Sequence, residues 1–141
     1  MKTRVPHSPD RIPVGRFDRN LLAAIAAPHG GQGTVEFREV WGSKDFRTSF
    51  QFVRHWLLPS GSSIGAFRRS LVEEVYVVIS GSGRFNVEGV EVQVGEGDCV
   101  FAGLGEVRSL AADDGSELEL FNVGVAVNGG INDAADATAV S

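Results

Sequence analysis

The amino-acid sequence predicts an all-β fold of the barrel or sandwich type. From Gly33 onward, apolar and polar residues alternate in short runs, which is the period of half-buried β-strands. Glycine-rich turns separate these runs at short intervals, and the period of an amphipathic helix is almost absent. About eight or nine short strands fit into this stretch, a number that suits a jelly roll or a similar closed double sheet.

The predicted strands follow one another closely along the chain. The first covers residues 34–41, and the second, 50–58, is rich in aromatic and β-branched residues. The most apolar segment, 74–80, is expected at the centre of the fold. Glu88-Gly89 is a candidate hairpin turn between two further strands. The remaining predicted strands lie at 84–87, 90–94, 99–102, 109–111 and 118–127.

The two ends of the chain differ in pattern from the barrel domain, which spans residues 30–127. Residues 1–29 are expected to form an N-terminal arm. Its apolar stretch, 21–27, is short and is read as either a short helix or a packed segment. Residues 128–141 are small and polar without periodicity, so we expect a disordered tail.

Size, charge and cysteine content limit the function. A chain of 141 residues fits one domain, and its formal net charge of -5 argues against nucleic-acid binding, which needs clustered Lys and Arg. We expect no membrane contact, because no apolar run approaches the roughly 20 residues that span a bilayer and no signal peptide is recognisable. The one cysteine, Cys99, excludes an intrachain disulfide, so a cytoplasmic protein is expected.

Two spaced motifs in the barrel segment resemble those of a known protein family. The first family motif has a glycine, a His-x-His pair, a glutamate and a second glycine, and the matching positions here are Gly61, Phe67, Arg69, Glu74 and Gly81. The second has a glycine, Pro-x-Gly and a histidine, matched here by Gly97, Gly103, Gly105 and Arg108. The family that both motifs resemble is the cupin superfamily, and the resemblance covers about residues 30–125. It implies a small cupin-type β-barrel, or jelly roll, in which the metal-binding histidines are replaced.

The replacements argue against the family's metal site. In the family, the three histidines and the glutamate bind a divalent metal, and only Glu74 remains of these ligands. A phenyl ring cannot ligate and a guanidinium has no lone pair to offer, so Phe67, Arg69 and Arg108 remove three of four ligands. The histidines left in the chain, two in the arm and one in a strand, lack ligand spacing: His7, His29 and His55. We therefore expect no metal and no other cofactor.

The same replacements predict a charged pocket around Glu74. The planar guanidinium groups of Arg69 and Arg108 would hold an anionic or enolisable substrate, with Phe67 as an apolar wall. Tyr76 lies two residues after Glu74 in one strand, so both side chains are expected to point inward.

The predicted strand 50–58 adds two candidates. His55 is the one strand histidine and would carry protons near neutral pH if its side chain faces the cavity. Trp56 is a candidate substrate contact, although tryptophan more often packs in a core or an interface.

These residues support two mechanistic interpretations. In the first, Glu74 is a general base, Tyr76 a proton donor, and the arginines stabilise an oxyanion or enolate. In the second, the carboxylate and the arginines are a buried network that replaces the metal as a structural element, because neighbouring arginines favour a charged carboxylate and weaken it as a base.

The leading hypothesis is a metal-independent isomerase, cyclase or lyase acting on a small polar or polyketide-like molecule in natural-product metabolism. The alternative is a non-catalytic ligand-binding or sensor cupin that recognises an anion through its arginines. A third possibility is a barrel whose role is assembly alone. In the first two, the partner is a small molecule. Because cupins commonly pair through one sheet and exchange N-terminal segments, the resemblance also implies a homodimer, with residues 21–27 available for exchange.

Overall fold

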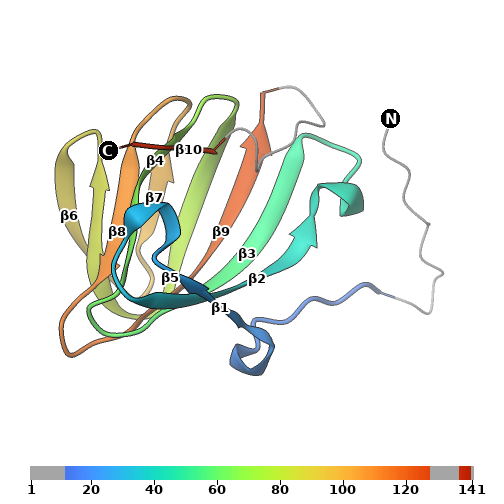
Figure 1. The fold of residues 1–141 in the computed structure, drawn as a ribbon. Coiled ribbons are helices and arrows are strands. Elements are labelled where there is room, and N and C mark those ends of the chain that lie inside the picture. Colours follow the sequence, from blue (N-terminus) through green and yellow to red (C-terminus); the bar gives the residue numbers. More distant parts are fainter. Residues whose placement is uncertain (1–11, 128–136, 141) are drawn as a thin grey trace.

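A computed structural model describes residues 12–127 and 137–140, which form a curled, half-open barrel of antiparallel strands (Figure 1). The all-β prediction is confirmed. The described strands are β1 (Ala23–Ala26), β2 (Thr34–Gly42), β3 (Phe50–Leu58), β4 (Ser63–Arg69), β5 (Val72–Val87), β6 (Val90–Gly95), β7 (Cys99–Ala102), β8 (Arg108–Ala112), β9 (Leu118–Ala126) and β10 (Ala137–Ala139). Three single-turn 3-10 helices accompany them: η1 (Arg19–Leu21), η2 (Pro28–Gly30) and η3 (Ser43–Asp45).

The long strand β5 belongs to both walls of the barrel. Its first part pairs with β9 and β7, in a sheet of order β1-β2-β3-β9-β5-β7. Its second part pairs with β8 and β6, in a sheet of order β10-β4-β8-β5-β6. Gly81 lies where the strand passes from one sheet to the other and has φ +83°. A Cβ atom there would overlap the carbonyl oxygen of Glu117, so the corner requires glycine.

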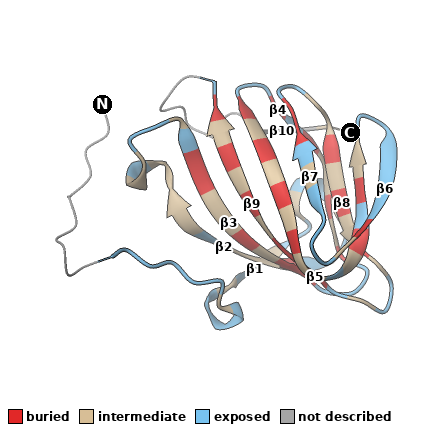
Figure 2. Ribbon diagram, turned by 180° about the vertical axis from the view of Figure 1, so that it is seen from behind, coloured by how far each residue is buried: buried red, intermediate tan, exposed pale blue. Residues whose placement is uncertain are grey.

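The core lies between the two walls. Buried residues alternate with less buried ones along β5, β8 and β9 (Figure 2), because successive strand residues face opposite sides of a sheet. Along β5, Glu74, Tyr76 and Val78 are buried while their neighbours are only half-buried. Side chains from both sheets meet in one apolar cluster, whose largest members include Leu58, Phe67, Tyr76, Phe85, Leu110 and Leu120. The inward face of the sheets therefore provides both the core and the lining of any internal cavity.

Three segments differ from the sequence prediction. The stretch 21–27, read as either a short helix or a packed segment, contains a strand, β1, which packs by pairing with β2. β4 was not predicted. Residues 137–139 also pair, with β4, so the expectation of a disordered tail does not hold there; residues 128–136 and 141 lie outside the described ranges. β1 and β10 join open sheet edges, where main-chain hydrogen bonds form without an alternating apolar pattern. In the described part of the chain, no helix is long and apolar enough to cross a membrane.

Candidate functional site

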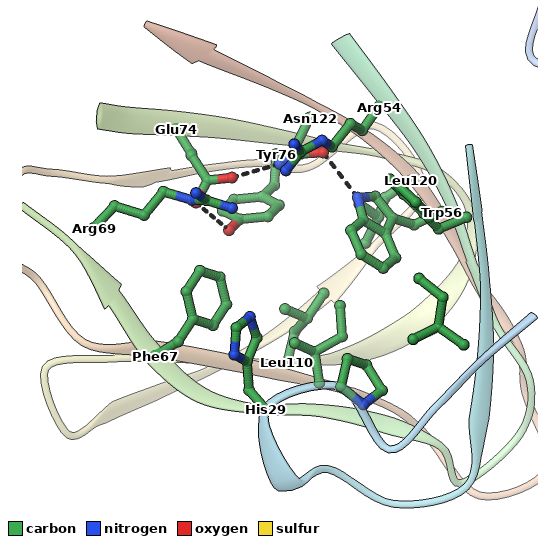
Figure 3. A pocket seen from close by; sticks show the side chains of 14 residues that line it. His29, Arg54, Trp56, Phe67, Arg69, Glu74, Tyr76, Leu110, Leu120 and Asn122 are labelled. Carbon is green, nitrogen blue, oxygen red and sulfur yellow. Dashed lines mark hydrogen bonds and ion pairs between the residues drawn. The ribbon is translucent and has the colours of Figure 1, made fainter. Parts of the chain in front are cut away.

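A cavity of about 290 Å³ opens on the inner face of the barrel, with the η2 loop at its mouth (Figure 3). Its walls are mainly apolar and come from both sheets and from β1; they include Ile25, Phe37, Trp56, Ile64, Phe67, Leu110 and Leu120. A smaller set of polar side chains also faces it: His29, Arg54, Arg69, Glu74, Tyr76 and Asn122. An apolar cavity with a few convergent polar groups is the usual form of a small-molecule site.

Glu74 is the centre of the polar set and is almost fully buried. Its Oε1 accepts hydrogen bonds from Tyr76 Oη at 2.8 Å and from Arg69 Nε at 3.2 Å. Its Oε2 accepts a hydrogen bond from Asn122 Nδ2 at 2.6 Å. Arg108 Nη2 adds an ion pair, 3.5 Å from Oε1. Both carboxylate oxygens are thus engaged by protein donors, which favours the buried-network interpretation of Glu74 over the general-base one.

The two arginines that pair with Glu74 have different positions. Arg69 lies in the cavity wall and is 5% exposed. Arg108 is fully buried beside the Phe67 ring, at 5.2 Å from its centroid, and is not part of the wall. It donates to the carbonyl oxygen of Glu106 at 2.9 Å, so the main chain between β7 and β8 holds it away from the cavity. Arg108, expected to contact a substrate, therefore does not line the cavity, whereas Phe67 and Arg69 do.

Tyr76 directs its hydroxyl proton at Glu74. Burial, with the nearby Glu74 carboxylate as the next cause, raises the pKa of Tyr76 well above its usual value. The hydroxyl therefore stays protonated, and its proton is committed to the carboxylate.

Trp56 lies in the cavity wall and connects to Glu74 through Asn122. Trp56 Nε1 donates to Asn122 Oδ1 at 2.9 Å, and the Asn122 amide then donates to Glu74. This chain fixes the orientation of the amide. Asn122 was missed in the sequence, although a signal existed: it is the one polar residue among the inward positions of β9, which are 118, 120, 122, 124 and 126.

His55 does not face the cavity, which corrects its candidacy as the proton carrier. It neighbours Trp56 in β3, and adjacent strand residues point to opposite faces of a sheet. On the outer face, His55 Nε2 lies 2.7 Å from Glu119 Oε2, and the Phe17 ring of the N-terminal arm covers it at 5.2 Å. Arg19 also donates to Glu119, at 2.8 Å. Burial alone would raise the pKa of Glu119, but the hydrogen bonds from His55 and Arg19 lower it overall.

The structure brings two further unpredicted residues to the cavity. His29, dismissed as an arm residue, stacks on Phe67 with 4.4 Å between ring centroids and 19° between ring planes. Arg54 packs over the Phe52 ring at 3.7 Å and pairs with Glu39 at 3.1 Å. No local motif marks His29, because the arm reaches β4 only through the tertiary fold. Arg54 lies two residues before Trp56 in β3, so strand alternation places the two on the same face.

The side chains around Glu74 do not fit a metal ion. Two guanidinium groups lie 3.2 Å and 3.5 Å from its carboxylate, where a bound cation would need donor atoms. Among the described residues, no group of three or more His, Cys, Asp or Glu could hold a metal.

Comparisons with known proteins place this geometry in context. A family model described as a cupin domain matches residues 54–124. The chain is 28% identical over 99 residues to the oxalate-binding protein of Thermotoga maritima, covering 70% of this chain and 82% of that protein. It resembles a crystal structure from the same organism, described as a predicted oxalate decarboxylase, with a TM-score of 0.75 and 26% identity over 82% of this chain and 100% of that one. The polyketide cyclase RemF of Streptomyces resistomycificus shares the fold, with a TM-score of 0.64 and 18% identity over 86% of this chain and 85% of that one.

Proposed function

Because the chain belongs to the cupin family, we propose that it is a metal-independent member whose cavity binds a small anionic or enolisable molecule and moves a proton on it. An isomerase, cyclase or lyase of natural-product metabolism would use such a step. The observation that carries the proposal is the Arg69 guanidinium in the cavity wall, held 3.2 Å from Glu74. It supplies a fixed positive charge that stabilises negative charge developing on a substrate oxygen.

The shape of the cavity supports a substrate with a flat apolar part. Phe37 and Trp56 line it from β2 and β3, while Phe67 and His29 line it from β4 and the η2 loop. Aromatic walls favour planar ligands by stacking. An aromatic 2-oxo acid such as phenylpyruvate combines a ring, a carboxylate and exchangeable protons next to a carbonyl, so it serves as a probe.

A second candidate function is binding without catalysis. The hydrogen bonds that occupy both oxygens of Glu74 favour it, since the most obvious base is already engaged. The name of the oxalate-binding relative also supports recognition of a small anion. In this function, Arg69 would hold the ligand and no bond would change.

The proposed function predicts that phenylpyruvate binds and that its methylene protons exchange with D2O faster than in buffer. Arg69→Met should weaken binding roughly 10- to 100-fold, because a hydrogen bond to a charged group is lost. Arg68→Met is the matched control, since Arg68 is exposed on the opposite face of β4 and should change nothing. NMR measures exchange, and calorimetry measures binding.

The outcomes separate the candidate functions. Pretreatment with a chelator should leave the exchange rate unchanged, and a rate lost with the metal and restored by Mn²⁺, Fe²⁺ or Zn²⁺ would refute metal independence. Binding without accelerated exchange would support the non-catalytic candidate. If Arg69→Met and the wild type bind phenylpyruvate equally well, Arg69 has no role in either candidate function.

We also propose that the protein is a homodimer that pairs through the outer face of β3, β9, β5 and β7. An outer apolar row crosses these four strands, in which Val53, Val123, Val75 and Phe101 are successive cross-strand partners. Phe101 is 56% exposed. A continuous apolar row on a sheet face is typical of an interface and costs free energy when it is hydrated.

Val75→Glu is expected to give a monomer, because a carboxylate in the centre of the outer apolar row would be buried without a partner. Val90→Glu is the control, since Val90 is 65% exposed on β6, outside the row, and its substitution should leave the dimer intact. Light scattering at micromolar concentration measures the mass. A wild-type monomer, or a Val75→Glu dimer, would contradict the proposal.

We further propose a cytoplasmic location. The support is the use of a single cysteine, Cys99, which is exposed and has no disulfide partner in the sequence. A stable exposed thiol is typical of a reducing compartment.

A further inference from the structure

Among the polar side chains of the cavity wall, one is available to exchange a proton with a ligand. Glu74 accepts hydrogen bonds at both oxygens, and Tyr76 commits its proton to Glu74. Arg54 and Arg69 keep their protons at any ordinary pH. His29 is the one other titratable side chain among the residues that line the cavity.

The position of His29 suits proton exchange with a bound ligand. Its ring stacks on Phe67, at the mouth of the cavity, and lies below the Arg69 and Glu74 pair (Figure 3). Within the described residues, neither ring nitrogen has a hydrogen-bond partner. The His29 residue is partly exposed at the surface, so a proton taken from a ligand can be passed on to water.

The main chain holds His29 in an uncommon conformation at this place. His29 has φ +52° and Ala27 has φ +43°, in the left-handed region that side chains other than glycine rarely adopt. The Ala27 amide donates to the Gly33 carbonyl at 2.8 Å, which closes the loop. Gly65 allows β4 to approach the His29 carbonyl so closely that a Cβ atom would overlap it. Strained backbone that the surrounding structure holds in place is characteristic of functional sites.

We propose that His29 is the general base of the pocket, an inference that rests on the proposed function. The neutral imidazole removes a proton from the carbon next to the substrate carbonyl. The C–H bond breaks, an N–H bond forms, and the electron pair becomes the C=C bond of an enolate whose oxygen lies beside Arg69. Return of the proton to the same or another atom restores neutral His29, and the step needs no oxidant or reductant.

The charges around His29 are compatible with this role. Burial, followed by the positive charge of Arg69 on β4, lowers the pKa of His29, while the Glu74 carboxylate on β5 raises it by a smaller amount. The neutral base therefore predominates at pH 7. The exchange rate should be level near neutral pH and should fall only below about pH 6.5, the usual pKa of histidine.

The test compares phenylpyruvate exchange by wild type, His29→Phe and His29→Gln. His29→Phe keeps the stack on Phe67 and loses the base, so exchange should fall at least about 100-fold while the affinity changes less than about threefold. Added imidazole should restore part of the rate in His29→Gln, and the acid limb of the pH profile should disappear in both variants. His55→Gln, on the outer face, is the matched histidine control and should keep the wild-type rate per folded molecule.

The two possible failures are distinguishable. Wild-type exchange that persists in both His29 variants would overturn the inference and leave the proposed function standing. Wild type that binds phenylpyruvate without exchange would overturn both. If His29→Phe unfolds, the imidazole rescue of His29→Gln decides whether His29 is the base. NMR of the His29 ring in the wild type is an independent measurement. A ring that stays protonated at pH 7 would also overturn the inference.

Discussion

Replacing Glu74 by alanine is expected to destabilise the protein by about 3–5 kcal/mol, the usual cost of removing one partner from a buried ion pair. Arg69 and Arg108, whose guanidinium nitrogens lie 3.2 Å and 3.5 Å from the carboxylate, would remain as uncompensated buried charges. Tyr76 and Asn122 would also lose their acceptor. The melting temperature should fall by about 10–15 °C, measured by calorimetry.

The triple variant Glu74→Leu, Arg69→Met, Arg108→Met shows whether charge is the cause. Replacing a complete buried ion cluster with apolar side chains of similar size is often neutral or stabilising. The triple variant should therefore be several kcal/mol more stable than Glu74→Ala. If the two are equally unstable, the loss comes from packing, and the view of Glu74 as the counter-ion of two buried arginines is refuted.

Gly65→Ala is expected to displace the η2 loop and impair the cavity. The new Cβ atom would overlap the main-chain carbonyl of His29 and lie 2.9 Å from the Gly31 nitrogen. Main chain cannot rotate away as a flexible side chain can, so the loop has to move. We expect about 1–3 kcal/mol of destabilisation and an exchange rate lower by about 100-fold, since a shift of about 1 Å at a catalytic group has that effect.

Gly95→Ala is the control for Gly65→Ala. The nearest atom to its Cβ would be the Gly81 carbonyl oxygen at 3.8 Å, an ordinary contact, so stability and exchange should stay close to wild type. Unchanged phenylpyruvate exchange in Gly65→Ala would show that the loop position does not control the proposed chemistry.

The fold was largely predictable because strand alternation is a local signal. Residues 34–41, 50–58 and 118–127 all show it, and the structure places strands there. β4 carries the sequence SIGAFRR, in which a glycine and two adjacent arginines obscure the alternation. β1 and β10 depend on main-chain pairing with a sheet edge, which a side-chain pattern does not reveal.

The site was predictable only where strand parity or motif spacing applied. Two-residue spacing correctly gave Glu74 and Tyr76 the same face. The same rule shows that His55 and Trp56 cannot both face the cavity, because adjacent residues of one strand face opposite sides of the sheet. His29 could not be found in this way. It reaches the cavity through the contact of the η2 loop with β4, which no local pattern encodes.

The double membership of β5 has a consequence for folding kinetics. Only its hairpin with β6 is local in the chain; β7, β8 and β9 all follow later, and β9 ends at Ala126. Folds dominated by such distant pairings fold slowly, on the order of milliseconds to seconds, because loop-closure entropy is lost before the contacts form. Glu74 and Tyr76 lie in the first part of β5, and their partner Asn122 lies in β9. A nascent chain from which β9 has not yet emerged therefore cannot assemble this pocket.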